Sequence, residues 1–151
     1  MSIACSFIKL FSDQKFSTVF YKYATSKEKD ELLEKVFSIY SNRIIFVSVF
    51  PNAWKLKNFS NNVIRIYPFE LDASDLFSIL LTFSYKSLVI IDSYPQLVNI
   101  YHKDKDKVIR LFLYFLAKMK GRAHILMFTN LKNSPSQPIF SKNFYHLFCK
   151  N

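Results

Sequence analysis

One aspartate in this chain follows an apolar run in the way that a metal-binding carboxylate follows a buried strand. The run Leu88–Ile91 leads directly into Asp92 and Ser93. In nucleotide-binding α/β proteins, the carboxylate at the carboxyl end of a central parallel strand holds Mg²⁺ or its water shell. Asp92 is therefore the first candidate for chemistry.

The phosphate loop that such an aspartate faces has no counterpart in the sequence. A loop of the pattern G-x-x-x-x-G-K-[ST] needs glycine, because its backbone N–H groups approach the phosphates in conformations that a Cβ atom forbids. The only glycine among the 151 residues is Gly121. The sequence thus predicts a nucleotide-binding type of fold that has lost its nucleotide, with no cofactor and no catalytic residue.

The other groups that resemble catalytic or metal sites have simpler explanations. Asp72 is expected to cap a helix, and Asp75 fits the preference of a first turn for negative charge. His146 and Cys149 are three residues apart and would share a helix face, but further ligands are lacking nearby. Ser93 lacks the flanking glycines of a nucleophile elbow, so nothing supports a Ser-His-Asp arrangement. We expect no metal site.

Length and composition indicate one folded domain that spans residues 1–151. Half of the residues are apolar, which is enough for a continuous core. The two cysteines, Cys5 and Cys149, show no pairing pattern, which is typical of a reducing compartment. The first residues lack a secretory pattern, and no run approaches the ~20 apolar residues of a membrane span. The sequence predicts an intracellular, soluble protein without membrane contact.

The charge is strongly basic and unevenly distributed. The chain has 21 lysine and arginine residues against 11 acidic residues, a net charge of +10, and every acidic residue lies at or before Asp106. Such an imbalance favours a polyanionic partner, and nucleic acid is the first choice. The alternative is that the abundant Phe, Ile, Lys, Asn and Tyr reflect an AT-rich genome and that the basic face only confers solubility.

Helix and strand patterns alternate along the chain. The first helix begins at a capping box formed by Thr25 and Glu28, and the last one ends before Gly121. Short β-branched and aromatic runs predict strands between the helices. In chain order the expected elements are strand 3–11, helix 25–40, strand 43–50, strand 63–67, helix 72–83, strand 87–92, helix 105–119 and strand 124–129. This alternation predicts an α/β sandwich with a mostly parallel central sheet.

The order of elements from Val63 to Asn130 resembles the core of RecA-type strand-exchange ATPases, especially the eukaryotic recombinase paralogues. The resemblance is carried by a strand with an R-I-Y-P run, a leucine-rich helix, the strand LVIIDS, a basic loop, a long helix and the strand HILMFTN. It implies a three-layer RecA-like sandwich of reduced size. The strand 43–50 would extend it upstream.

Two departures from the recombinase pattern concern the nucleotide. The segment Phe11–Thr18, where the family would place its phosphate loop, has Lys15 and hydroxyl groups but no glycine. Asn130 is followed by Leu131, whereas the recombinases often carry Asn-Gln there as a polar switch. The resemblance therefore leaves Lys15, Asp92 and Asn130 as relic positions without a bound nucleotide.

The small size, without a separate N-terminal DNA-binding domain, resembles the divergent paralogues of Shu-type recombination complexes. That resemblance implies a non-catalytic nuclear subunit of a heteromeric complex that acts in homologous recombination and the repair of DNA damage. Its partners would be other recombinase paralogues, a SWIM-type zinc protein, the recombinase filament, and single-stranded or branched DNA. It would bind DNA and promote assembly of the recombinase filament.

The resemblance also places two lysine-bearing loops toward the DNA, Asn99–Lys107 and Leu131–Phe140. Lysine contacts phosphates without reading sequence, and an aromatic ring can stack on a base. In the first loop, Asp104 and Asp106 nearly cancel the lysines, so a solvated helix start is the alternative there. The expected nucleic-acid-binding residues are Tyr101, His102, Lys103, Lys105, Lys107, Arg110, Lys132 and Lys142.

Other interpretations of the same residues stay open. A degenerate P-loop ATPase would use Lys15 and the hydroxyl groups that follow it together with Asp92. A basic module that binds RNA, or an interaction scaffold, would also fit the composition. The 17 phenylalanines and nine tyrosines exceed what a small core readily buries, so we expect a partner to cover some of them. The stretch Phe140–Phe148 either meets such a partner or folds back on the domain.

Overall fold

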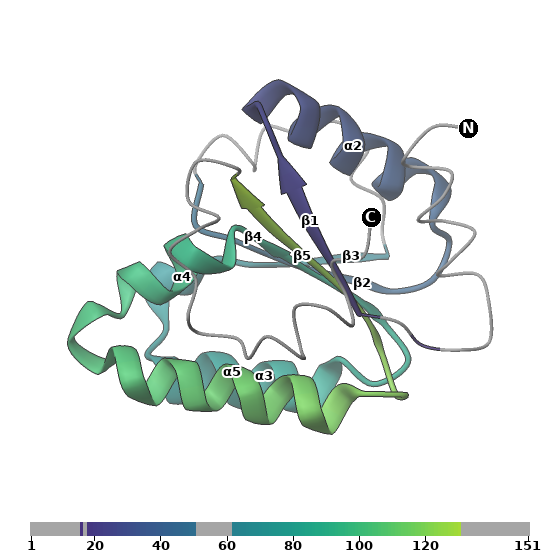
Figure 1. Cartoon of the computed structure of the whole chain (residues 1–151). Coiled ribbons are helices and arrows are strands. Elements are labelled where there is room, and N and C mark those ends of the chain that lie inside the picture. Colours follow the sequence, from purple (N-terminus) through teal and green to yellow (C-terminus); the bar gives the residue numbers. More distant parts are fainter. Residues whose placement is uncertain (1–15, 17, 51–61, 131–151) are drawn as a thin grey trace.

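The computed structural model describes residue 16 and residues 18–50 and 62–130 of the chain. Within these ranges, five strands form one sheet in which every pairing is parallel (Figure 1). In chain order the strands are β1 (Thr18–Tyr23), β2 (Ile44–Ser48), β3 (Val63–Ile66), β4 (Leu88–Asp92) and β5 (His124–Asn130). Their order across the sheet is β1-β5-β4-β2-β3.

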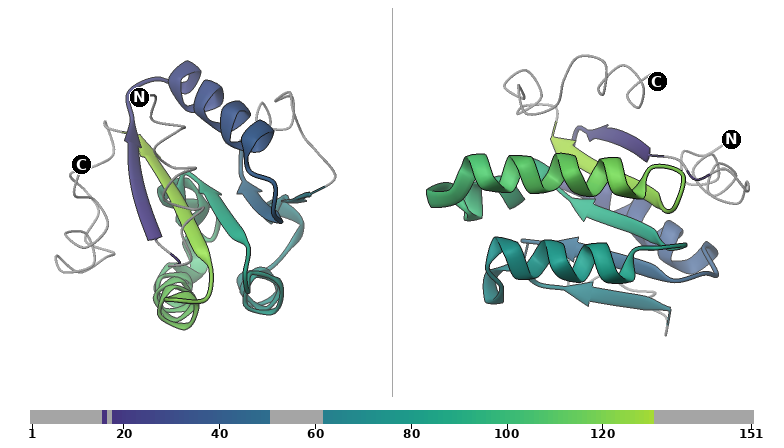
Figure 2. Two further views of the ribbon diagram at one scale, coloured as in Figure 1. Left: turned by 90° about the vertical axis from the view of Figure 1, so that its right-hand side faces the viewer. Right: turned by 90° about the horizontal axis from the view of Figure 1, so that it is seen from below.

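Helices cover both faces of this sheet. The described helices are α2 (Ser26–Ile39), η2 (Pro68–Glu70), α3 (Ala73–Phe83), α4 (Tyr94–Ile100), η3 (His102–Asp104) and α5 (Lys105–Met119), of which η2 and η3 are short 3₁₀ helices. α2 packs on one face of the sheet, and α3, α4 and α5 pack on the other (Figure 2). The layers run helix, sheet, helix, which confirms the predicted α/β sandwich with a parallel sheet.

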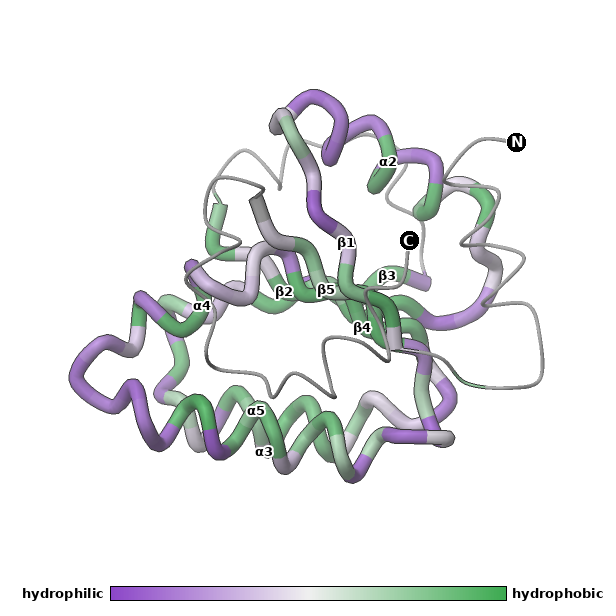
Figure 3. Tube along the Cα trace, in the orientation of Figure 1, coloured by the Kyte–Doolittle hydropathy of each residue, from purple (hydrophilic) through white to green (hydrophobic). Residues whose placement is uncertain are grey.

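An apolar cluster on each face fills the space between the sheet and its helices. In Figure 3 the central strands and much of α3 and α5 are coloured as hydrophobic. In β4, Val89 and Ile91 belong to the cluster on the side of α3 and α5, whereas Leu88 and Ile90 belong to the cluster under α2. All four side chains are buried, because this central strand is covered on both faces. Its sequence is therefore a continuous apolar run rather than an alternating one.

The capping residues expected from the sequence begin both α2 and α3. Thr25 Oγ1 accepts a hydrogen bond from the N–H of Glu28 at 3.1 Å, and Glu28 Oε2 accepts one from the N–H of Ala24 at 3.0 Å. Asp72 Oδ1 accepts a hydrogen bond from the N–H of Asp75 at 2.8 Å. These bonds satisfy N–H groups that have no partner inside a helix. The predicted capping box and the predicted Asp72 cap are confirmed.

α5 has the predicted bounds, Lys105–Met119. Gly121 follows the helix with φ +74°, a left-handed conformation that glycine adopts without the strain a Cβ atom would cause. This confirms the predicted helix end. The buried residues of α5 are Val108, Phe112, Phe115, Leu116 and Met119.

The carboxyl ends of β1 and β4 send the chain to opposite faces of the sheet. After β1 the chain enters α2 on one face and returns as β2, past β5 and β4. After β4 it enters α4 and α5 on the other face and returns as β5. In open parallel α/β sheets, ligands bind at such a topological switch point, outside the carboxyl ends of the strands. A site is therefore expected beside the ends of β1 and β4.

The structure corrects the expected position of the phosphate loop. β1 begins at Thr18, so the segment Phe11–Thr18 precedes a strand, whereas a phosphate loop must follow a strand and open a helix. The segment that meets this requirement is Ala24 and Thr25, between β1 and α2, and it also contains no glycine. The expected strand 3–11 lies outside the described residues.

The structure also corrects the expected loop Asn99–Lys107. This segment is helical, because it contains the end of α4, all of η3 and the first residues of α5. Pro95 lies in the first turn of α4, where its missing N–H is not needed, and Leu97 and Val98 are buried beneath the helix. The lysines of this segment therefore lie on a helical corner and not on an open loop.

Candidate functional site

A buried ion pair occupies the position where the fold places a ligand. The ammonium Nζ of Lys29 lies 3.0 Å from Oδ1 of Asp92 and donates a hydrogen bond to Oδ2 at 3.2 Å. Ser48 Oγ donates a second hydrogen bond to Oδ2 at 2.9 Å. Among the described residues, Oδ1 accepts no hydrogen bond, so its negative charge is compensated by the nearby ammonium charge of Lys29.

Each member of this cluster comes from a different element, and the fold brings the elements together. Ser48 and Asp92 are the last residues of the neighbouring strands β2 and β4, and the parallel register pairs them directly. Lys29 is the fourth residue of α2, the helix that follows β1. The cluster therefore lies at the carboxyl edge of the sheet, beside the topological switch point.

The pair is almost completely removed from water. The exposed fractions are 4% for Lys29, 1% for Asp92 and 0% for Ser48. Burial raises the pKa of the Asp92 carboxyl, and the Lys29 charge and the hydrogen bonds from Lys29 and Ser48 act against that rise. Removing one partner from such a pair leaves a buried charge uncompensated, which typically destabilises a protein by about 3–5 kcal/mol.

Aromatic rings enclose the Lys29 ammonium on its other sides. Its Nζ lies 4.3 Å from the ring centroid of Phe50 and 5.4 Å from that of Tyr23. Ser48 Oγ accepts a hydrogen bond from the N–H of Phe50 at 3.1 Å, which fixes the residue that carries the nearer ring. Asp30 Oδ1 is 3.9 Å away from Nζ at the partly exposed margin. A cation in contact with aromatic faces gains electrostatic stabilisation, more so when it is desolvated.

The start of α2 is occupied by a carboxylate of the chain itself. Glu28 accepts hydrogen bonds from the N–H of Ala24 and, at 2.7 Å through Oε1, from the hydroxyl of Tyr21. The bond to Tyr21 is the main reason that the pKa of Glu28 is lowered, and burial together with Glu28 raises the pKa of Tyr21 to about 12. A helix N-terminus attracts anions, and here the Glu28 carboxylate lies beside the start of α2 and accepts from the N–H of Ala24.

The turn between β4 and α4 is strained but does not form a hydrolase site. Ser93 has φ 64° and ψ 83°, a left-handed conformation that is uncommon for serine and is often found at functional sites. Its side chain is buried, with 1% exposure. His124 begins β5 and pairs with Leu88 at the amino end of the strands, whereas Ser93 follows the carboxyl end of β4. The described residues therefore do not assemble a Ser-His-Asp arrangement.

Neither a metal centre nor a membrane span is found in the part of the chain that the structure describes. No three His, Cys, Asp or Glu side chains in it gather closely enough to hold a metal ion. No helix in the same part is long and apolar enough to cross a bilayer. His146 and Cys149 lie outside the described residues.

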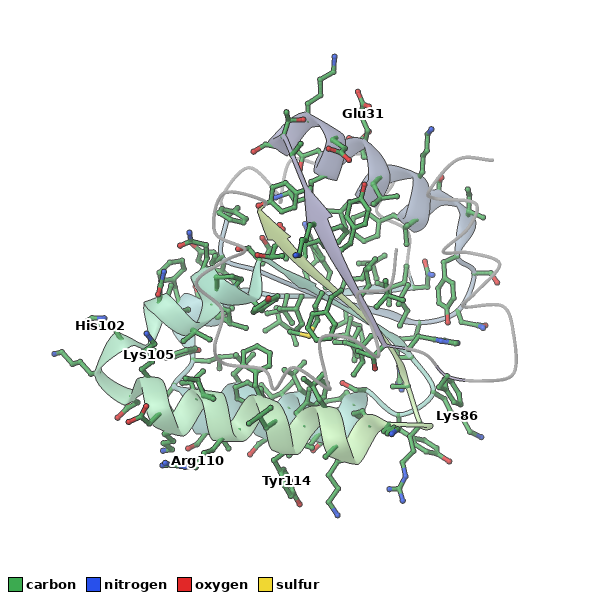
Figure 4. The ribbon with its side chains drawn as sticks, in the orientation of Figure 1. Glu31, Lys86, His102, Lys105, Arg110 and Tyr114 are labelled. Atoms are coloured by element: carbon green, nitrogen blue, oxygen red, sulfur yellow. The ribbon has the colours of Figure 1, made fainter. Side chains whose placement is uncertain are left out.

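The residues expected to bind nucleic acid separate into two groups. Tyr101 is held by the backbone, because its hydroxyl shares its one hydrogen between the carbonyl oxygens of Pro68, at 3.0 Å, and Leu71, at 2.9 Å. Burial also raises the pKa of Tyr101 to about 12. The other described members are exposed along η3 and α5: His102, Lys103, Lys105, Lys107 and Arg110. Figure 4 labels His102, Lys105 and Arg110.

The remaining expected site residues are not described. Lys15, Lys132 and Lys142 lie outside the described residues, and so does the stretch Phe140–Phe148. For Asn130 the structure describes the backbone, which ends β5 opposite Tyr23.

Sequence reasoning found Asp92 but missed Lys29. Lys29 lies in the charged run K-E-K-D-E, which is typical of a solvated helix face. Its spacing carried a usable signal, because Lys29 precedes the buried Leu32, Leu33 and Val36 by three, four and seven residues. These intervals place the lysine on the buried face of the helix, where a charged residue needs a partner.

Comparison of the sequence with protein-family models and with curated protein sequences gives no match. Any assignment of function to this chain therefore depends on its fold, its charges and the geometry of the buried cluster.

Proposed function

We propose that this chain is a RecA-like domain in which an internal ion pair replaces the nucleotide, and that it is a non-catalytic subunit of a Shu-type recombination-accessory complex. In that complex it binds DNA in the nucleus and promotes assembly of the recombinase filament. The observation that carries the non-catalytic part of the proposal is the contact between Lys29 and Asp92.

In phosphate-loop enzymes a lysine contacts the phosphates and a strand-end aspartate acts through Mg²⁺, so the nucleotide and its metal separate the two charges. Here the lysine on the helix after β1 and the aspartate at the end of β4 contact each other directly. A nucleotide would have to break this pair and replace both of its contacts. Such a replacement is unfavourable, because each separated charge would stay buried until the ligand satisfied it.

The segment between β1 and α2 adds a second reason. A phosphate cradle directs several backbone N–H groups at the anion, and it uses glycine to do so. Ala24 and Thr25 provide no glycine, and the N–H groups of Ala24 and Glu28 already donate to side chains of the same turn. These two N–H groups are therefore not available to a phosphate unless they give up those bonds.

Charge and exposed apolar residues support the role as a binding subunit. The strand β3 lies at the end of the described sheet and carries Ile64 with 42% exposure, and Phe69 follows with 56% exposure. Exposed apolar residues near a sheet edge favour contact with another subunit. The basic residues after Asp106 favour contact with DNA.

The test of this function is purification of the tagged full chain from its own cells, with and without nuclease treatment, followed by mass spectrometry. The proposal predicts a RecA-like paralogue or a SWIM-type zinc protein that stays bound after nuclease treatment. Recovery of ribosomal or RNA-processing proteins only, lost on nuclease treatment, would instead mean that the chain works in an RNA context.

The position of Lys29 favours one other function, a weak nucleotide hydrolase. Lys29 lies four residues into the helix that follows β1, close to where a phosphate-binding lysine would begin such a helix. If the pair opened, Lys29 would turn to a phosphate and Asp92 to Mg²⁺. This function predicts ATP turnover that is lost in Asp92→Ala.

A further inference from the structure

The outward side of α5 carries one continuous stripe of basic and aromatic residues. Lys107, Arg110, Tyr114 and Lys118 follow one another at intervals of three, four and four residues, and all four are exposed. Residues at these intervals lie on one side of a helix. Figure 4 shows Arg110 and Tyr114 projecting away from the sheet. We call these four residues the α5 stripe.

Further exposed basic residues lie beyond both ends of the α5 stripe. At its far end, the N–H of Lys86 donates to the carbonyl oxygen of Arg122 at 2.8 Å, which holds the turn after α3 against the turn after α5. The exposed basic residues beyond the two ends of the stripe are Lys103, Lys105, Lys86, Lys120 and Arg122.

The two helical layers differ in charge. α5 contains four basic residues and one acidic residue, a net charge of +3, whereas α2 on the opposite face contains three basic and four acidic residues, a net charge of −1. Glu31 marks the α2 side in Figure 4, on the other side of the sheet from Arg110. A polyanion is therefore attracted to the α5 face and not to the α2 face. Among the described residues, no ion pair neutralises Lys107, Arg110 or Lys118.

The stripe also presents an aromatic ring among its charges. Tyr114 is 51% exposed, and the Nζ of Lys118 lies 5.6 Å from its ring centroid. Exposed aromatic rings in a basic setting stack on unpaired bases, while the surrounding cations contact the phosphates. A duplex would offer its phosphates only, because its bases are already stacked. The combination fits a single strand better than a duplex.

We propose that the α5 stripe is the docking surface for a single-stranded nucleic acid. Lys107, Arg110 and Lys118 contact phosphates, and Tyr114 stacks on a base. The stripe is about 16 Å long at the rise of an α-helix, which matches about five nucleotides of a stacked strand. The inference rests on the proposed DNA-binding function and gives it a location, on the side of a helix rather than in a loop.

An anionic lipid surface would be attracted by the same charges, but the helix does not fit it. A membrane-surface helix inserts an apolar face beside its basic residues. The apolar side of α5, including Val108, Phe112 and Phe115, is buried against the sheet. The α5 stripe therefore has no large apolar face to offer to lipid.

The test is fluorescence anisotropy with the full chain and a labelled oligothymidylate, measured over a series of salt concentrations. Arg110→Glu/Lys118→Glu should weaken binding by about tenfold or more, and the slope of log affinity against log salt should fall by about 1.4. The matched control is Lys27→Glu/Lys35→Glu, which makes the same charge change at exposed positions of α2. It should change the affinity by less than about twofold.

A second variant tests the stacking contact separately from charge. Tyr114→Leu keeps the net charge and should weaken binding by about fivefold or more. All of the substituted residues are exposed, so circular dichroism and melting should match those of the unmodified chain. If a charge reversal disturbs the fold, Arg110→Gln/Lys118→Gln provides the same test with a smaller change. Repeating the titration with oligouridylate establishes whether the strand is DNA or RNA.

Three results would overturn the inference: equal loss in the α5 variant and the α2 control, no binding by the unmodified chain, or tighter binding to phosphatidylserine vesicles than to oligonucleotide. The co-purification experiment separates this inference from the proposed function. If a recombinase-type partner is recovered but the α5 variant binds DNA as well as the unmodified chain, only the proposed docking surface is wrong. If binding depends on the α5 stripe but no such partner is recovered, the proposed complex is wrong and the docking surface is supported.

Discussion

Lys29 and Asp92 are 63 residues apart in the chain, yet the lysine Nζ lies 3.0 Å from Oδ1 and 3.2 Å from Oδ2 of the aspartate. The contact ties α2 to the end of β4, across the position where a parallel α/β sheet usually binds its ligand. Both side chains are buried, and neither can lose its partner without leaving a charge in the interior. The pair is therefore a structural element of the sandwich, at the edge of the sheet where open parallel α/β sheets bind ligands.

The first prediction concerns the energetic coupling of this pair. Lys29→Met and Asp92→Leu should each reduce the free energy of unfolding by about 3–5 kcal/mol, because each leaves a buried charge unpaired. The double variant Lys29→Met/Asp92→Leu should recover most of that loss, because apolar replacement of a whole buried pair is often neutral. Urea unfolding of the full chain measures all three. If the two single losses simply add in the double variant, the charges do not interact as described.

The second prediction concerns pH and the start of α2. Hydrogen bonds from Tyr21 and Ala24 lower the pKa of Glu28 below its ordinary value of 4.5. Just below pH 4.5 the unfolded chain therefore binds more protons than the folded chain. The contribution of ionised Glu28 to the free energy of unfolding is present above pH 4.5 and is lost as the pH falls through the pKa of the folded state. The stability advantage of the unmodified chain over Glu28→Gln should shrink as the pH falls below 4.5. Melting curves over that range measure it, and an advantage that grows on acidification would contradict the assignment.

The third prediction concerns the role of Tyr101. Tyr101→Phe removes the hydroxyl that donates to the carbonyl oxygens of Pro68 and Leu71. It should lower the free energy of unfolding by about 1 kcal/mol, because the Leu71 carbonyl oxygen loses this partly buried donor whereas the Pro68 oxygen keeps the N–H of Leu71. Oligonucleotide affinity should stay unchanged, since the phenyl ring is retained. The neighbouring variant His102→Ala, at an exposed position, is the stability control. A loss of affinity in Tyr101→Phe without loss of stability would assign the hydroxyl to the nucleic acid instead.

The layered α/β architecture could be predicted from the sequence because the local helix and strand patterns are strong. Thr25 and Glu28 could be recognised as a capping box, and the continuous apolar run of β4 indicated a strand covered on both faces. β1 was missed because its sequence does not alternate regularly between buried and exposed positions: of its six residues, only Thr18, Phe20 and Tyr23 are buried. α4 was missed because Tyr94 and Pro95 at its start are typical of a turn.

The candidate site was predictable only in part, because it depends on contacts between distant segments. Asp92 could be recognised from the strand that it ends. That Lys29 is its partner could not be recognised, since no local pattern shows a contact between residues 63 positions apart. Missing β1 also displaced the expected phosphate loop to Phe11–Thr18 and drew attention to Lys15 rather than to Lys29. Lys29 already lay in the expected helix 25–40, and a correct assignment of β1 would have shown that this helix directly follows a strand.

The most direct test of the central claim is the melting temperature of the full chain with and without excess MgATP. A ligand at about 100 times its dissociation constant stabilises the folded state by about 2.7 kcal/mol, which shifts melting by several degrees in a domain of this size. Because Lys29 and Asp92 satisfy each other, we expect no shift in the unmodified chain. A saturable increase that disappears in Asp92→Ala would contradict it and would identify the cluster as a working nucleotide site.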